Sequence, residues 1–591
     1  MISIFRHVRP GPGLLALPAL AFILVVFGLP MLDLFRASLG SPGNLSLDTY
    51  TAFFTQGSYS RVLLRTIVAG TVVTGLCLVL GYPLAYAINR TCGTARNVML
   101  LLVVVPYLTS LLVRTYAWIV MLGDHGLVNK TLMFLGLTDA PVQILYTSLG
   151  AYIGMVHIML PFMVLPLLSV MNGLDARLVP AAKSMGCGPV RAFGKVFLPL
   201  TLPGIKSGCI LVFILAIGFY ITPAALGGLS DTLLSELIEI QVSQTMNFRL
   251  AATAAFVLLA ITVLFLFIFG ANFSSTSSGL LASGASGGGR LRGAIFRWIG
   301  RTFYRAFFAT GLADALRRRR AAAWQAALYR RDPFLVARPL AVQAYATVCL
   351  LFLILPSLVV LAMSFSSDPF LAFPPTSFSL QWYEEFFSDS SWINALGKSL
   401  MIALVSTALA CVLGVLAAYG LDRSPTLASG LMPVLMTPVI VPIIVVAVAL
   451  YGGFVNWGLI GTDAGLVLAH TLGGVSYVVI IVSATLAGFD RRLERAALSM
   501  KAHPITAFRR VTLPLVRYGI LAGAIFAFIH SFDEVVVATF IGGFGEKTLP
   551  MKMWEDIRHQ INPTIAAVST LLLLVPVLGL IGMQLSRRQR A

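Results

Sequence analysis

The chain has 591 residues, of which 58% are hydrophobic and only 11% are charged, and its mean hydropathy is +0.90. A soluble protein of this length needs far more charge to cover its surface, so the composition excludes a water-soluble globular protein. The net charge of +19 is spread over the segments between apolar runs. That spread disfavours nucleic-acid binding and favours anionic lipid headgroups as the counter-charge.

About twelve apolar runs of roughly 20 residues follow one another, each long enough to cross a bilayer as a helix. They are continuously apolar rather than alternating, which favours helices over a β-barrel. The runs of the first half lie near residues 13–37, 61–88, 98–122, 144–170, 200–223 and 250–271. Those of the second half lie near residues 338–363, 394–420, 428–453, 464–487, 515–538 and 563–585. We therefore expect an all-α membrane protein.

Basic residues gather in the segments that an even number of spans places on one side of the membrane. Examples are Arg6, Arg90, Lys183, Arg423 and Arg588. The positive-inside rule makes this side cytoplasmic and predicts that both termini lie there.

The middle of the chain separates two halves of similar length. Residues 274–289 read SSTSSGLLASGASGGG, the composition of a flexible linker. The basic stretch that follows is either a helix on the membrane surface or a solvated tether, which the linker composition favours. We expect a first half at 1–273, a cytoplasmic linker at 274–337 and a second half at 338–591, each half carrying six transmembrane helices.

A pattern of about 25 residues recurs in both halves. Residues 181–205 read AAKSMGCGPVRAFGKVFLPLTLPGI, and residues 496–520 read AALSMKAHPITAFRRVTLPLVRYGI. Residues 47–54 and 380–387 also match in Leu, Tyr and Phe-Phe. Two six-helix repeats in the same orientation imply a pseudo-two-fold axis along the membrane normal, with a pathway along that axis.

The recurring pattern predicts a helical hairpin on the cytoplasmic face. Pro189 and Pro504 fit the first turn of its second helix, where a missing N–H costs nothing. An ordinary connecting loop has little reason to recur so closely, so we expect two docking points for two copies of one partner.

This pattern resembles the "EAA" coupling loop of binding-protein-dependent ABC importer permeases, and the resemblance covers the chain apart from the linker. It implies a type I importer permease in a bacterial inner membrane, two cytoplasmic ATPase subunits and a periplasmic solute-binding protein. The coupling residues that it implies are Ala181, Ala182, Gly186, Arg191, Phe193, Ala496, Ala497, Ala502, Phe508 and Arg509. The acid of the family pattern is replaced by Pro180 and Arg495, although Glu494 is adjacent, and Lys501 replaces the family's glycine in the second copy.

No ATP site is expected in this chain. The nearest match to a P-loop, GGFGEKT at 542–548, lacks the Gly-Lys-Ser/Thr order. A clustered set of nucleophile, base or metal ligands is also missing from the sequence, which disfavours a membrane enzyme. We expect a transport subunit without cofactors, with ATP and Mg²⁺ held by the partner ATPases.

Four further segments resemble the two permease subunits of spermidine/putrescine importers, fused head to tail. They are LTSLLVRTYAWIVML at 108–122, GFYITPAALGG at 218–228, HSFDEVVVATFIGG at 530–543 and LPMKMWEDIRHQINPTIAAVST at 549–570. The resemblance implies a polyamine or related amine as the substrate. Opine-like, aminophosphonate and ferric-iron permeases are the alternatives within the group.

Asp533 and Glu534 are the most informative acids, because charge inside an apolar helix usually faces a partner or a watery path. A cationic substrate is one such partner, and Arg114 is the alternative. Tyr116, Trp118 and Tyr220 can offer aromatic faces to an ammonium or belong to an interfacial belt. The same acids could carry protons in a secondary transporter, but duplicated docking loops disfavour that class.

Overall fold

The computed structural model describes residues 12–269 and 340–574, apart from 42–43, 176, 369–372, 544, 546 and 560–561. The predicted linker at 274–337 lies outside the described residues. Within them the secondary structure is helical except for one short antiparallel pair, β1 (Gly40–Ser41) and β2 (Asn44–Leu45). The expectation of an all-α membrane protein is confirmed.

The first half begins with a bent span and ends with α14. Its helices are η2 (Pro12–Ala16), α1 (Leu17–Ile23), η3 (Leu24–Gly28), α2 (Leu29–Leu39), α3 (Asp48–Thr55), α4 (Gly57–Arg90), α5 (Gly93–Leu108), α6 (Leu111–Leu122), α7 (Leu127–Phe134), α8 (Ser148–Asn172), α9 (Leu178–Ser184), α10 (Pro189–Ala192), η4 (Phe193–Phe197), α11 (Leu198–Ile217), α12 (Ile221–Leu226), η5 (Leu229–Asp231), α13 (Leu234–Ser243) and α14 (Phe248–Ile268).

The second half repeats this order without a counterpart of α7. Its helices are α18 (Leu340–Met363), α19 (Gln381–Ser388), α20 (Ser390–Asp422), α21 (Pro425–Ile440), α22 (Ile443–Trp457), α23 (Asp463–Ala487), α24 (Arg491–Ser499), α25 (Pro504–Ala507), η6 (Phe508–Thr512), α26 (Leu513–Phe532), α27 (Val536–Ile541) and α28 (Leu549–His559), followed by an apolar helix at Thr564–Leu574.

The described part of the chain holds 9 helices long and apolar enough to cross a membrane, or up to 11 if each bent pair counts as one span. The expected runs near 98–122 and 428–453 are the two broken ones. Their axes bend by 92° after α5 and by 94° after α21. The twelfth run is seen only as Thr564–Leu574, and its remainder lies outside the described residues.

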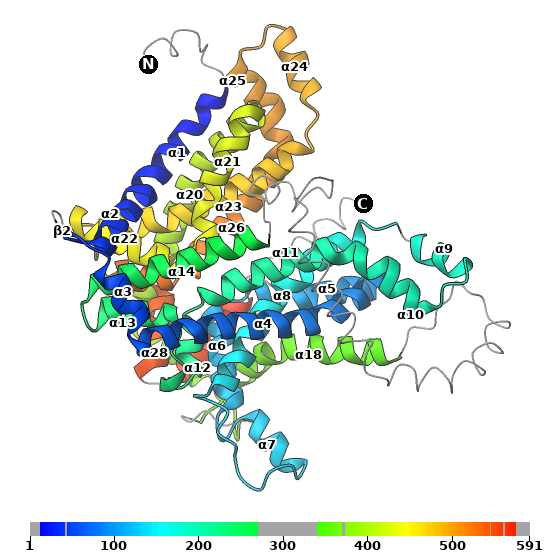
Figure 1. The fold of residues 1–591 in the computed structure, drawn as a ribbon, viewed down its shortest axis with the longest axis vertical. Helices are drawn as coiled ribbons and strands as arrows, with labels where there is room; N and C mark the ends of the chain where they lie inside the picture. Colours follow the sequence, from blue (N-terminus) through cyan, green and yellow to red (C-terminus); the bar gives the residue numbers. More distant parts are fainter. Residues whose placement is uncertain are drawn as a thin grey trace.

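The two halves share their tertiary contacts as well as their sequence pattern. Leu234 N donates to Thr66 Oγ1 at 2.8 Å, and at the equivalent place Leu549 N donates to Ser399 Oγ at 2.7 Å. The halves fall out of register because residues 123–147, which include α7, join α6 to α8, whereas residues 458–462 alone join α22 to α23. In Figure 1, α7 projects away from the body of the molecule.

The first span of each half packs against the other half. The helices η2, α1 and α2 contact α20 and α22, and α18 contacts α4, α5 and α6. His157 on α8 hydrogen-bonds through Nε2 to the carbonyl of Leu353 on α18, 3.0 Å away. The first spans are thus exchanged between the halves, and each exchanged span forms one of two contact regions that hold the halves together. The two recurring hairpins, α9–α10 and α24–α25, lie far apart at the ends of two diverging arms (Figure 1).

Candidate functional site

Both copies of the recurring pattern form the predicted hairpin of two short helices. Pro189 and Pro504 each open the second helix, as expected. The turn between the helices contains a residue in the left-handed region in each copy, Gly186 with φ 85° and Lys501 with φ 63°. Glycine adopts this conformation freely, whereas lysine carries a Cβ that makes it unfavourable. The departure at Lys501 therefore costs stability without changing the shape of the turn.

Replacing Lys501 with glycine is expected to stabilise the second hairpin by about 1 kcal/mol. The mirror change, Gly186→Ala, should destabilise the first hairpin by a similar amount, although its Cβ meets no atom within 4 Å. Hydrogen-exchange protection of each hairpin measures both effects. Equal protection in wild type and Lys501→Gly would show that the turn is not strained.

The predicted coupling residues divide between an exposed and a buried set. Ala182 and Ala497, in the first helix of each hairpin, are buried. Ala502 is half-buried in the turn of the second hairpin. The exposed members are Ala181, Gly186, Arg191, Ala496 and Arg509. The structure thus places these five residues where a partner can reach them.

Phe193 and Phe508 face the protein's own helices. The Phe193 ring packs edge-on against Tyr86 of α4 with centroids 5.6 Å apart, and Phe508 packs in the same way against Tyr419 of α20 at 4.7 Å. The two phenylalanines therefore fasten each hairpin to the long helix of its own half.

A buried carboxylate fastens the second hairpin further. Glu494 accepts hydrogen bonds from Tyr419 Oη at 2.8 Å and Thr512 Oγ1 at 2.7 Å, and it pairs with Arg423 at the end of α20. Burial disfavours its charged form, but the hydrogen bonds from Arg423, Thr512 and Tyr419 outweigh burial and hold the pKa of Glu494 below its ordinary value. This stabilisation is present above the ordinary glutamate pKa and is lost as the pH falls through the lowered value.

The first hairpin lacks this carboxylate. Val179 stands at the position equivalent to Glu494. Arg90, the counterpart of Arg423, lies over the Tyr86 ring with Cζ 5.4 Å from its centroid, as Arg423 lies over the Tyr419 ring at 3.4 Å, but it has no glutamate partner among the described residues of the hairpin. The two hairpins are therefore equivalent in shape but differ in how they are held.

The exposed tips of the hairpins carry apolar side chains that the sequence analysis did not single out. Met185 and Met500 are 82% and 78% exposed, and the β-branched Val190 and Ile505 beside them are also exposed. Each pair occupies equivalent positions in the two copies. The recurrence of apolar residues at these positions of the repeated pattern was the sequence signal that could have identified them. Exposed methionines are typical of adaptable binding surfaces.

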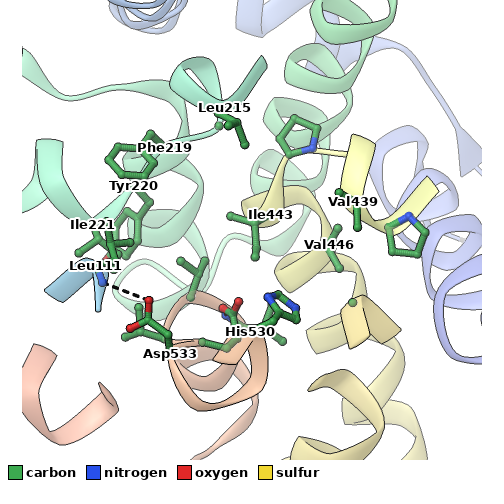
Figure 2. A pocket seen from close by; sticks show the side chains of 18 of the residues that line it. Leu111, Leu215, Phe219, Tyr220, Ile221, Val439, Ile443, Val446, His530 and Asp533 are labelled. Carbon is green, nitrogen blue, oxygen red and sulfur yellow. Dashed lines mark hydrogen bonds between the residues drawn. The ribbon is translucent and has the colours of Figure 1, made fainter. Parts of the chain in front are cut away.

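A cavity of about 320 Å³ lies between the two halves. Helices α6, α8, α11 and α12 of the first half and α21 to α23, α26 and α27 of the second line it. Both broken spans contribute the ends at which they break. Figure 2 shows Phe219, Tyr220 and Ile221 on one side and Val439, Ile443 and Val446 on the other. Of the predicted pathway residues, Arg114, Tyr220, Asp533 and Glu534 are among the lining residues.

Asp533 stabilises the start of α6, where the broken span of the first half resumes after α5. Its Oδ2 accepts a hydrogen bond from the backbone N–H of Leu111, the first residue of α6, at 3.1 Å (Figure 2). A carboxylate is favourable at a helix N-terminus, where backbone N–H groups lack helical partners. Arg114 lies in the same first turn of α6. Asp533 therefore joins the second half to the broken helix of the first.

The equivalent break in the second half is made differently. Pro442 precedes α22, and its ring fixes a backbone that cannot continue the helix. Gly218 stands in the place equivalent to Asp533, and a Cβ there would meet Pro442 Cβ at 2.7 Å. At the second-half break, Pro442 and Gly218 therefore stand where Ser110 and Asp533 stand at the first-half break. This difference makes the cavity chemically asymmetric.

Glu534 is the second acid of the cavity, and it is buried, whereas Asp533 is half-buried. Its Oε1 accepts from Val537 N at 2.9 Å, which caps the short helix α27. His470 and His530 line the same wall, and His470 Nδ1 lies 2.9 Å from Ser531 Oγ. The second half thus supplies both acids and both histidines, and the first half supplies Arg114 and Tyr220.

Tyr116 and Trp118 do not line this cavity. Tyr116 is fully buried within the bundle. Trp118 packs against His157 and Phe352, with ring centroids 5.5 Å apart in each case, so it joins α6 to the exchanged helix α18. Their sequence neighbour Arg114 reaches the cavity because it lies one turn nearer to the break.

Comparison with known proteins decides the family. The family described as "Binding-protein-dependent transport system inner membrane component" matches residues 77–274 and 410–591, which together exceed half of the chain. The chain belongs to this family. The transport-system family is matched twice, once in each half, as the fused pair of permease units predicted from the sequence requires.

Two relatives of the chain are named as permease proteins. The chain is 34% identical over 225 residues to the "Spermidine/putrescine transport system permease protein PotB" of Haemophilus influenzae, covering 38% of this chain and 78% of that protein. It is 33% identical over 246 residues to the "Putrescine transport system permease protein PotI" of Escherichia coli, covering 40% of this chain and 87% of that protein. The recognition of a spermidine/putrescine-type permease is confirmed, and an ion-coupled secondary transporter does not fit.

The sequence analysis of this permease missed a polar cluster where the halves meet away from the hairpins. Arg558 on α28 pairs with Glu239 on α13, Nη1 to Oε1 3.3 Å apart, and lies 3.4 Å from Tyr220 Oη. Glu236 and Glu239 are one turn apart in a short helix, and that spacing was the available signal. Only Tyr220 of this cluster was a predicted site residue.

Proposed function

We propose that this permease is the membrane-spanning subunit of an ATP-driven importer that carries a small cationic amine across the bacterial inner membrane. The observation that carries this proposal is the presence of two equivalent hairpins with exposed tips in one chain, one in each of the two halves that line the cavity. Membership in the transport-system family supports it. The hairpin face is then cytoplasmic, with both termini on that side, and the opposite face is periplasmic.

Two ATPase subunits, carrying ATP and Mg²⁺, dock on the two hairpins. Their closure on ATP draws the hairpins together, and the halves rock about the pseudo-two-fold axis. Rigid rocking of one repeat against the other around a fixed central site gives alternating access. A periplasmic binding protein delivers the solute to the opposite face. The chain itself performs no covalent chemistry.

The lining of the cavity supports an amine as the solute. The buried Glu534 and the half-buried Asp533 place two carboxylates in the lining of the cavity, and a charge removed from water favours an opposite charge nearby. The names of the relatives point to polyamines. Arg114 in the same lining gives a second candidate, a zwitterionic solute of the opine or aminophosphonate kind, whose acidic group would face the guanidinium.

Copurification and uptake test the proposal together. The full chain, expressed with candidate ATPase and binding-protein subunits from the same genome, is expected to form a complex of one permease chain and two ATPase subunits by native mass spectrometry. Reconstituted in proteoliposomes, that complex should take up radiolabelled putrescine or spermidine in an ATP-dependent manner. Two permease chains in each functional complex, or uptake without ATP, would contradict the proposed architecture.

A further inference from the structure

The cluster around Glu239 lies where α13 of the first half meets α28 of the second (Figure 1). Glu239 is only 4% exposed. Its Oε1 accepts from Ser243 Oγ at 2.9 Å and faces Arg558, whereas its Oε2 is buried with no hydrogen-bond partner among the described residues. A buried carboxylate oxygen without a donor is costly, so this position has unused capacity to bind a cationic donor.

Two aromatic rings complete the surroundings of the Arg558 guanidinium. Its Cζ lies 5.6 Å from the centroid of the Trp554 ring. Tyr220 meets Trp554 edge-on, with centroids 5.7 Å apart. A carboxylate with aromatic faces is the combination that recognises ammonium and guanidinium ions. In this conformation the chain's own arginine occupies it.

The two members of the pair differ in exposure. The Arg558 side chain is 37% exposed, and the Glu239 side chain is 5% exposed. The arginine is therefore the member of the pair that an entering solute can reach. Glu236 lies one turn from Glu239 on α13, and burial, followed by the neighbouring charge of Glu239, raises the pKa of Glu236.

The cluster is continuous with the central cavity. Tyr220 belongs to both, because it is among the cavity-lining residues and its hydroxyl contacts Arg558. In Figure 1, α13 and α28 lie on the side of the molecule away from both hairpins, which places the cluster on the side from which a solute would enter.

We propose that Glu239, Tyr220 and Trp554 form an entry subsite for a primary ammonium or guanidinium group, which Arg558 fills in this conformation and which the solute occupies by displacing Arg558. Exchange of one cation for another breaks the Arg558–Glu239 link between the halves as the solute enters. The inference rests on the proposed amine importer and names the residues that first receive the amine.

Chemical rescue tests the subsite without requiring transport. Arg558→Ala in the full chain, assembled with its ATPases in lipid nanodiscs, should melt at a lower temperature than wild type. Methylguanidinium or propylammonium chloride should restore the melting temperature, whereas sodium chloride at the same ionic strength should not. The double variant Arg558→Ala/Glu239→Gln should show no rescue, because the carboxylate that binds the cation is gone.

Lys547→Ala is the matched control. It removes the cation of the Lys547–Glu555 pair, which joins the residues before α28 to the same helix but does not involve Glu239, so the organic cations should not act on it. Should Arg558→Ala fail to assemble, Arg558→Gln retains a side chain of similar length. Absence of rescue, or equal rescue in the double variant, overturns the subsite.

Uptake then separates the subsite from the proposed function. Glu239→Gln should raise the KM for putrescine uptake about tenfold, the effect of one charge-assisted hydrogen bond, with little change in maximal rate. Rescue in a complex that imports no amine supports the subsite and contradicts the proposed substrate. Amine uptake with an unchanged KM in Glu239→Gln and no rescue overturns the subsite and leaves the importer standing.

Discussion

Replacing Glu494 with alanine is expected to lower substrate uptake about tenfold or more while the complex still assembles and hydrolyses ATP. The Glu494 and Arg423 side chains are 11% and 14% exposed, and removal of one partner from a buried pair costs about 3 kcal/mol. Arg423, Tyr419 and Thr512 would lose their common acceptor. The second hairpin would then move without carrying α20 with it. The ratio of ATP hydrolysed to solute transported measures this loss of coupling.

Two variants control for a general loss of stability. Val179→Ala makes a comparable truncation at the equivalent position of the first hairpin, where no ion pair exists, and should leave the ratio nearly unchanged. The exchange Glu494→Arg with Arg423→Glu should recover part of the uptake that either single change removes. A normal transport ratio in Glu494→Ala would mean that the aromatic contact of Phe508 with Tyr419 holds the hairpin sufficiently by itself.

Replacing Glu534 with glutamine should lower amine uptake about tenfold, because a charge-assisted hydrogen bond contributes about 1.5–3 kcal/mol. The glutamine carbonyl can still accept from Val537 N, so the cap on α27 is retained. Affinity of the binding protein for the solute should not change, since that protein is separate from the permease. Uptake by the reconstituted complex and solute binding to the isolated binding protein are the two measurements.

Asp533 should behave differently from Glu534. Asp533→Asn keeps an oxygen that can accept from Leu111 N, whereas Asp533→Ala leaves the N-terminus of α6 without it. We therefore expect Asn to retain much more uptake than Ala, the signature of a residue that positions a helix. Intact uptake after neutralisation of both acids, combined with loss of uptake in Arg114→Gln, would refute a cationic solute and favour a zwitterionic one.

The charged and titratable side chains that line the cavity do not follow the two-fold symmetry of the helices. All four of its acids and histidines, Asp533, Glu534, His470 and His530, come from the second half, and Arg114 comes from the first. The proposed entry subsite reverses this arrangement, with its acid on the first half and its arginine on the second. An amine would thus pass from a carboxylate of one half to a carboxylate of the other.

The amino-acid sequence determined the class, the duplication and the family. Continuous apolar runs report membrane spans directly, because a bilayer requires each backbone group to be satisfied within its own helix. The hairpins were predictable for a similar local reason, since Pro189 and Pro504 fix the start of a helix through their own ring geometry. Both the signal and its cause lie within a few consecutive residues.

Only the tertiary structure decided which side chains meet. The breaks after α5 and α21 fall inside long runs whose average hydropathy is that of a single span, so hydropathy alone could not reveal them. Asp533 reaches Leu111 across 422 positions of the chain, and Arg558 reaches Glu239 across 319. Such contacts depend on how the helices pack, including the exchange of the first span between the halves, and packing is a property of surfaces that only the folded chain brings together.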